Sequence, residues 1–121
     1  MTQTVLTIDD SRTMRDMLLL ALEDAGFTVI QAVDGVEGLE TLAARGADVV
    51  ITDINMPRMD GFGVIEGVRA DPNHRATPVL VLTTESDADK KARARAAGAT
   101  GWIVKPFDPA KLVDAVRRVA A

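Results

Sequence analysis

The sequence predicts an α/β protein in which helices cover both faces of a doubly wound, five-stranded parallel sheet. Short apolar runs alternate five times with longer amphipathic stretches along the 121 residues, which is the pattern of repeated strand–helix units. Most of these runs are apolar at consecutive positions, as expected for strands that are buried on both faces. Five units are too few for a closed barrel, which needs eight, so an open sheet is favoured.

The expected strands are short runs rich in Val, Ile, Leu and Thr. They cover Thr4–Ile8, Thr28–Ala32, Asp48–Thr52, Pro78–Thr83 and Thr100–Val104. Parallel strands joined by right-handed crossovers all point the same way. The residues that follow them should therefore gather at one edge of the sheet, where ligands bind in folds of this class.

The stretches between the strands are predicted to be helices. Four of them carry apolar residues three and four positions apart, as on the buried face of a helix; in the first, Met14, Met17 and Leu18 belong to this face. The fourth stretch, Ala88–Ala97, is instead rich in Ala, Lys and Arg. We interpret its charges as a solvated face, with part of a docking surface as the alternative.

Local signals mark the ends of several helices. Thr13 and Asp16 have the spacing of a capping box, with Asp in place of the usual Glu, at the start of the first helix. Gly26, Gly46 and Gly98 follow three helical stretches, and glycine closes a helix in the left-handed conformation at little cost.

Composition restricts the function classes. The 14 basic and 18 acidic residues give a net charge of −4, which makes general nucleic-acid binding a poor hypothesis. The absence of cysteine excludes disulfides and thiol chemistry. No apolar stretch approaches the roughly 20 residues that cross a bilayer, and residues 1–4 carry no sign of a signal peptide. We expect a single domain over residues 1–121, monomeric and cytoplasmic.

Chemically active side chains follow four of the predicted strands. Asp9 and Asp10 follow the first strand, Asp53 follows the third, Thr83 ends the fourth and Lys105 follows the fifth. Carboxylates that share one crevice repel each other, so they favour a divalent cation with a preference for oxygen ligands, such as Mg²⁺. Together with a hydroxyl and an ammonium group, they suit phosphoryl transfer through an aspartyl phosphate.

Each signal is weak alone, because Asp53 could be a turn residue and Asp9-Asp10 could cap a helix. Their order along the chain is specific: Asp9-Asp10, then Asp53-Ile54-Asn55-Met56-Pro57-Arg58-Met59-Asp60-Gly61, then Thr83, then Lys105-Pro106-Phe107. This set resembles the receiver domain of two-component response regulators, most closely the single-domain chemotaxis regulators of the CheY type. The resemblance covers essentially the whole chain and implies their flavodoxin-like (βα)₅ fold.

The resemblance also implies roles for individual residues. Asp53 would be the phosphoacceptor. Asp10 and Asp53 would bind Mg²⁺ by their side chains, Asp9 through a metal-bound water, and Asn55 by its backbone carbonyl.

Four further residues take roles from the same resemblance. Thr83 and Lys105 would contact the phosphoryl oxygens, and the Lys105–Pro106 peptide bond would be cis. Trp102 stands where CheY has a switching tyrosine, and it would act with Thr83. Because indole is larger and donates only through its ring nitrogen, a purely structural role for Trp102 stays open.

The function implied is a phosphorylation-activated switch. A CheA-type histidine kinase would supply the phosphoryl group, and the protein would catalyse only its own phosphorylation and dephosphorylation. With no effector domain expected after the fifth helix, the output would be a protein contact, for instance with the flagellar motor switch or a phosphatase.

Several other functions are possible for a site of this composition. A phosphate sink and a phosphorelay intermediate share its chemistry. A small aspartyl-phosphate phosphatase of the haloacid-dehalogenase type would need Asp-x-Asp after the first strand, where this chain has Asp9-Asp10-Ser11. A flavin site is disfavoured because Asp9 and Asp10 would repel the flavin phosphate.

Overall fold

The protein is described by a computed structural model over residues 2–120. Five strands alternate with five helices: β1 (Thr4–Ile8), α1 (Arg12–Asp24), β2 (Thr28–Ala32), α2 (Gly35–Arg45), β3 (Val49–Thr52), α3 (Gly61–Ala70), β4 (Val79–Thr83), α4 (Ala88–Ala97), β5 (Gly101–Val104) and α5 (Pro109–Ala120). The strands form one parallel sheet in the order β2-β1-β3-β4-β5. The predicted doubly wound fold is confirmed.

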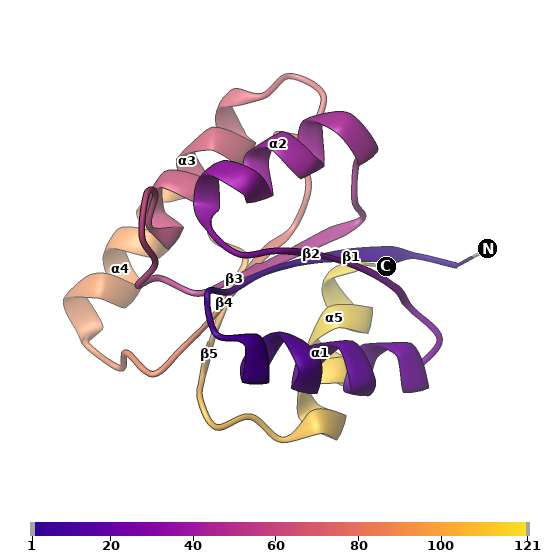
Figure 1. The fold of residues 1–121 in the computed structure, drawn as a ribbon. Helices are drawn as coiled ribbons and strands as arrows, with labels where there is room; N and C mark the ends of the chain where they lie inside the picture. Colours follow the sequence, from indigo (N-terminus) through magenta and orange to yellow (C-terminus); the bar gives the residue numbers. More distant parts are fainter. Residues whose placement is uncertain (1, 121) are drawn as a thin grey trace.

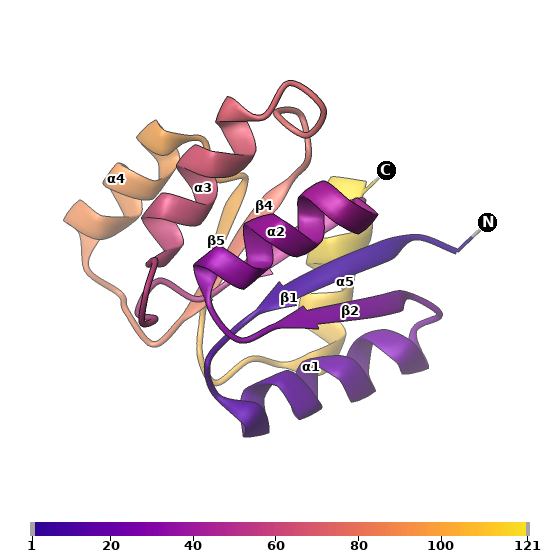
Figure 2. The ribbon, with the colours of Figure 1, turned by 45° about the horizontal axis from the view of Figure 1, so that its top comes forward.

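The helices lie in two layers around the sheet. Figure 1 shows α1 and α5 on one face, and α2, α3 and α4 on the other. In Figure 2, β2 forms an outer edge beside β1. The order reverses direction between β1 and β3, because the chain first adds β2 on one side and then β3, β4 and β5 on the other. This reversal is the point at which ligands bind in open α/β sheets.

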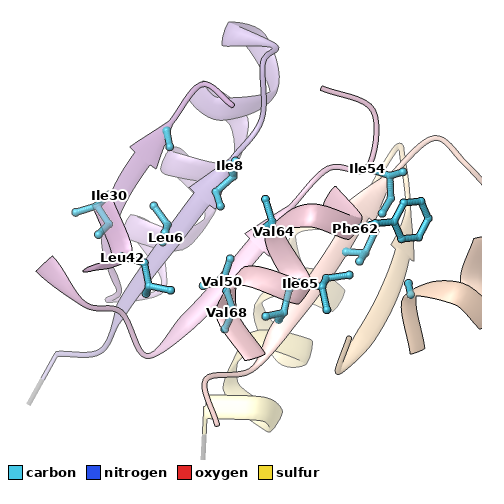
Figure 3. Packing of buried hydrophobic residues seen from close by; sticks show 14 residues of the cluster. Leu6, Ile8, Ile30, Leu42, Val50, Ile54, Phe62, Val64, Ile65 and Val68 are labelled. Carbon is cyan, nitrogen blue, oxygen red and sulfur yellow. The ribbon is translucent and has the colours of Figure 1, made fainter. Parts of the chain in front are cut away.

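Alternate side chains of the central strands pack into two separate hydrophobic cores, one on each face of the sheet. In β1, Leu6 and Ile8 face the layer of α2, α3 and α4, whereas Val5 faces α1 and α5. The first core is shown in Figure 3, where side chains of α3 meet those of β1 and β3. The second core joins residues of α1 and α5, such as Leu22 and Val116. Burial on both faces explains why these strands read as continuous apolar runs.

The three glycine signals are confirmed, and one capping signal is wrong. Gly26, Gly46 and Gly98 follow α1, α2 and α4 with φ of 94°, 71° and 112°. The cap of α1 is Ser11 rather than Thr13: the Ser11 hydroxyl accepts the Met14 N–H at 3.2 Å. The helix thus begins at Arg12, and a Thr13 already inside its first turn cannot cap it.

Two other expectations are corrected by burial. Met17 was placed on the buried face of the first helix, but it is 46% exposed, because α1 turns only a narrow stripe around Leu18 and Leu22 toward the sheet. The fifth strand is not buried on both faces, since β5 lies at the edge of the sheet and Val104 is 41% exposed.

The two ends of the described chain meet on the side of the sheet opposite to the strands' carboxyl ends. The Gln3 Nε2 donates to the Ala120 carbonyl oxygen at 3.0 Å, which ties the start of β1 to the last turn of α5. Within residues 2–120, no helix is both long and apolar enough to span a membrane.

Candidate functional site

The register of the sheet brings two of the predicted carboxylates together. Ile8 of β1 pairs with Thr52 of β3, so the next residues, Asp9 and Asp53, leave the sheet side by side. Their backbones continue the ladder, because the Asp53 N–H donates to the Ile8 carbonyl at 3.0 Å and the Asp9 N–H to the Ala32 carbonyl at 3.2 Å. The two acids are thereby fixed at the switch point of the sheet.

Asp10 completes an acidic cluster with them. One carboxylate oxygen from each of Asp9, Asp10 and Asp53 lies within 4.8 Å of the others. Asp9 is 2% exposed and Asp53 is 9% exposed, whereas Asp10 is open to solvent. Hard oxygen donors at this spacing, with one side open for water, fit the coordination that Mg²⁺ prefers.

Lys105 lies between the two less exposed acids. Its Nζ is 2.8 Å from Asp9 Oδ2 and 2.9 Å from Asp53 Oδ2. The backbone holds it there, since the Lys105 N–H donates to the Thr83 carbonyl at 2.8 Å. Burial alone would lower the pKa of Lys105, but the hydrogen bonds to Asp9 and Asp53 outweigh it and raise the pKa. The ammonium group is therefore charged at neutral pH.

The second oxygens of the same acids accept backbone N–H groups. The Ile54 N–H donates to Asp53 Oδ1 at 2.6 Å, and the Ser11 N–H donates to Asp9 Oδ1 at 2.9 Å. Both carboxylates are thus oriented by partners on both oxygens. Asp9 thus has one partner nearby in the sequence, the N-cap residue Ser11 of α1, and one far away, Lys105.

The loop after Asp53 turns sharply into α3. The Gly61 N–H donates to the Ile54 carbonyl at 2.8 Å, and a Cβ at Gly61 would overlap the carbonyl oxygen of Asp53. Glycine is required here because the loop folds back against the residue that carries the carboxylate. Asn55 lies in this loop with an exposed side chain. The Lys105–Pro106 peptide bond on the facing loop is cis, as the resemblance implies.

Thr83 and Trp102 lie outside the acidic cluster but share a neighbour. Thr83 is fully buried at the end of β4, and its Oγ1 accepts the Glu85 N–H at 3.3 Å. The indole Nε1 of Trp102 donates to the Glu85 carbonyl at 3.0 Å. Trp102 is half-buried and also packs against the core beneath α3 and α4. The proposed pair is therefore connected through the loop between β4 and α4.

Glu85 is the residue of this region that sequence reasoning missed. Its Oε1 accepts from Lys90 Nζ at 3.0 Å and from Asn55 Nδ2 at 3.3 Å. The hydrogen bond from Lys90, followed by that from Asn55, lowers the pKa of the Glu85 carboxyl group. A single acid in a loop has no periodicity that would have marked it, and only its place two residues after Thr83 was available as a signal.

The comparison with known protein families agrees with this arrangement. The sequence model of the family described as "Response regulator receiver domain" matches residues 5–117. The chain belongs to the response regulator receiver family.

Individual relatives of this receiver domain carry chemotaxis names. It is 37% identical over 116 residues to the chemotaxis protein CheY of Pseudomonas aeruginosa, covering 95% of this chain and 94% of that protein. It is 38% identical over 116 residues to CheY-3 of Vibrio cholerae, covering 95% and 89%. The solved structure of CheY4 of Vibrio cholerae superposes with a TM-score of 0.94 at 44% identity, covering 98% and 99% of the two chains.

Proposed function

We propose that this receiver domain is a phosphorylation-activated switch in chemotaxis signalling, with Asp53 as the phosphoacceptor. The observation that carries the proposal is the position of Asp53. Like Asp9, it belongs to the oxygen cluster and contacts Lys105, and in addition it begins the loop whose Asn55 side chain donates to Glu85. The chemotaxis names of the relatives support the choice of pathway.

The residues of the site have separate tasks in this proposal. The side chains of Asp10 and Asp53, the backbone carbonyl of Asn55, and Asp9 through a water molecule would hold Mg²⁺. When bound, the ion supplies positive charge against the oxygens of the transferring phosphoryl group.

The chemical step forms one bond and breaks one. A carboxylate oxygen of Asp53 bonds to phosphorus, and the bond from phosphorus to the imidazole nitrogen of a phosphohistidine breaks, leaving the electron pair on the histidine. Lys105 already contacts Asp53 Oδ2 at 2.9 Å, so its ammonium group is placed to hold a phosphoryl oxygen. The Thr83 hydroxyl would donate to another oxygen. The protein thus changes only itself and converts no external substrate.

The phosphoryl donor in this proposal is a histidine kinase of the CheA type, and the output is binding to a target protein such as the flagellar motor switch. A phosphate sink would use the same site without a target. The two functions separate in one binding measurement, because only the switch gains affinity for a motor protein when Asp53 is modified.

The proposal is tested by modification of the purified protein with acetyl phosphate and Mg²⁺, followed by intact mass. Wild type is expected to gain one phosphoryl group, and Asp53→Asn to gain none while keeping its fold. Chelation of Mg²⁺ should suppress the adduct in wild type, because the carboxylate cluster would again repel the donor.

A matched control removes a different acid of the same loop. Asp60 caps α3 by accepting the Gly63 N–H at 2.9 Å, and asparagine caps a helix equally well, so Asp60→Asn should be modified like wild type. Equal labelling of Asp53→Asn and wild type would place the nucleophile elsewhere and overturn the proposal.

A further inference from the structure

Arg58 has an unusual backbone conformation in the loop between β3 and α3. Its φ is 68°, and within residues 2–120 it is the only residue other than glycine with a positive φ. The Met59 N–H donates to the Pro57 carbonyl at 2.8 Å, so Arg58 is the centre of a three-residue turn. Turns with a positive φ at the central residue are rare and strained. Glycine or asparagine would suit this position better, which indicates that the arginine side chain has a task of its own.

The side chain of Arg58 reaches Asp34, the N-cap residue of α2. Arg58 Nη1 lies 3.3 Å from Asp34 Oδ2, and Asp34 Oδ1 accepts the Glu37 N–H at 2.9 Å. Asp34 is 4% exposed, and in the part of the chain that the structure describes it is the one buried acid outside the acidic cluster. Because a buried carboxylate that loses its cationic partner is costly, this ion pair fixes Arg58 to the start of α2.

Met59 brings the same loop into direct contact with α2. A Cβ at Gly35, the first residue of that helix, would lie 2.7 Å from the Met59 carbonyl oxygen and 2.8 Å from its Cβ. Helices α2 and α3 lie side by side on this face of the sheet (Figure 2). The turn at Arg58 is thus held against α2 by one ion pair and one close backbone contact.

Two residues connect Arg58 to Asn55, and neither gives the chain much freedom. The ring of Pro57 fixes its φ, and Met56 packs against the first hydrophobic core. A change of conformation at Arg58 would therefore be passed on to Asn55, whose backbone carbonyl is a Mg²⁺ ligand in the proposed function.

We propose that Arg58 and Asp34 are positioning residues for divalent-cation binding, because their ion pair holds the turn in the conformation that makes the Asn55 carbonyl available to the ion. This inference rests on the proposed function for the identity of the metal ligands. The order of the turn is a separate property, which can be measured in the absence of Mg²⁺.

The experiment compares Arg58→Gly, Asp34→Asn, the double variant and Arg58→Lys with wild type. The first two changes spare the local structure, because glycine adopts a positive φ at little cost and asparagine caps a helix as well as aspartate does. The first readout is the Mg²⁺ dissociation constant, from the amide chemical shifts of ¹⁵N-labelled protein during titration with MgCl₂. The second is the order parameter of the amides of the non-proline residues 55–60 in Mg²⁺-free protein.

A matched control removes a cation from the other end of the same helix. Arg45 is exposed in the last turn of α2, and Arg45→Ala changes the net charge by the same amount as Arg58→Gly. This variant should match wild type in both readouts.

Arg58→Gly and Asp34→Asn are each expected to weaken Mg²⁺ binding about two- to fivefold, the range of a partly exposed ion pair, and to lower the order parameters of the loop. The double variant should bind Mg²⁺ no more weakly than the weaker single variant, since both changes remove one contact. Arg58→Lys should retain most of the affinity, because the contact uses a single nitrogen and lysine keeps the charge.

The direction of the change at Arg58 separates positioning from simple electrostatics. Removing a cation near a metal site strengthens the binding of a metal cation, whereas losing a positioning contact weakens it. Stronger or unchanged Mg²⁺ binding in Arg58→Gly would therefore overturn the proposal, as would additive losses in the double variant. Order parameters equal to wild type in both single variants would remove the role of the ion pair in holding the turn.

The wild-type titration distinguishes a failure of this inference from a failure of the proposed function. If wild type bound Mg²⁺ and the variants bound it equally well, this inference alone would be wrong. If wild type bound no Mg²⁺, the metal site of the proposed function would be wrong, and the inference would fall with it.

Discussion

Helices α3 and α4 lie side by side and have ten residues each, but different forces hold them. α3 buries five residues, among them Phe62, Ile65 and Val68, whereas α4 buries Ala94 alone. Polar contacts replace the missing burial around α4. The Arg93 guanidinium lies 3.9 Å above the Phe62 ring, and Lys90 pairs with Glu85.

The difference shows which helix can move at low cost. Full burial of a large apolar side chain stabilises a fold by about 1.5–3 kcal/mol, so α3 is fixed by several such terms. A surface ion pair contributes about 0–1 kcal/mol. A shift of α4 would break mainly polar contacts and the burial of one small residue, Ala94, which suits an element next to a site whose charge would change on the proposed phosphorylation.

The largest effect is expected in α3. Ile65→Ala should lower the free energy of unfolding by about 2–5 kcal/mol, because it leaves a cavity at a residue with no exposed surface. Urea denaturation followed by circular dichroism measures the loss. A loss below about 1 kcal/mol would mean that α3 is not the fixed helix, and the comparison would fail.

An intermediate effect is expected at Arg69, which connects the two helices. Its Nε and Nη2 donate to the Gly98 carbonyl, just after α4, at 3.0 and 2.7 Å, and its Nη1 donates to the Thr77 carbonyl at 2.6 Å. Arg69→Ala should cost about 1–3 kcal/mol, since these carbonyl groups lose their partner. Lys, which cannot form the planar fork, should restore only part of the stability; full recovery in Arg69→Lys would contradict the assigned geometry.

A smaller effect is expected at Arg93. Removing its contact with the Phe62 ring in Arg93→Ala should cost about 0.5–1 kcal/mol, and hydrogen exchange should accelerate in α4 but not in α3. Arg95→Ala serves as the control, because Arg95 is exposed on the same helix and Arg93 is the cation found over an aromatic ring within residues 2–120. Equal acceleration in both variants would argue against the ring contact.

The smallest effect appears only at high pH and concerns Lys105, which ties the edge after β5 to the central acids. The pKa of Lys105 is raised from its ordinary value of 10.5 in the folded protein. The charge of Lys105 therefore stabilises the fold fully below pH 10.5, and this stabilisation is lost as the pH rises through the folded pKa. The stability difference between wild type and Lys105→Met should therefore be constant near pH 7 and narrow in strongly alkaline urea titrations. If the difference in the free energy of unfolding stayed constant at all pH values, the stabilising effect of Lys105 would not depend on its charge.

Patterns in the sequence predicted the buried part of the molecule well. Strands β1 and β2 and helix α4 have the predicted bounds, and the other three strands begin one residue later than expected. The residues predicted to begin these three strands, Asp48, Pro78 and Thr100, lie just before the paired part of the sheet. They still form backbone hydrogen bonds with the neighbouring strand: for instance, the Asp48 N–H donates to the Thr4 carbonyl, and the Val50 N–H donates to the Pro78 carbonyl. The strand order β2-β1-β3-β4-β5 was not predicted, because periodicity does not order strands.

The sequence predicted less of the surface of the site. Asp9, Asp10, Asp53 and Lys105 could be grouped because parallel strands place their ends at one edge. The contacts of Glu85 and Arg69 could not be predicted, because each depends on loop conformations and on partners tens of residues away. Met17 was misplaced for a related reason: helical spacing finds an apolar face but does not say how wide a stripe the sheet covers.

The hydrogen bond between Gln3 and Ala120 has a practical consequence for engineering. The two ends meet at the edge opposite to Asp53, so a short peptide could join them without crossing the site. New termini could then be opened in the exposed turn at residues 72–76, between α3 and β4. Such a circular permutant would keep every strand in its place, and a fluorescent reporter inserted there would leave the acidic cluster accessible.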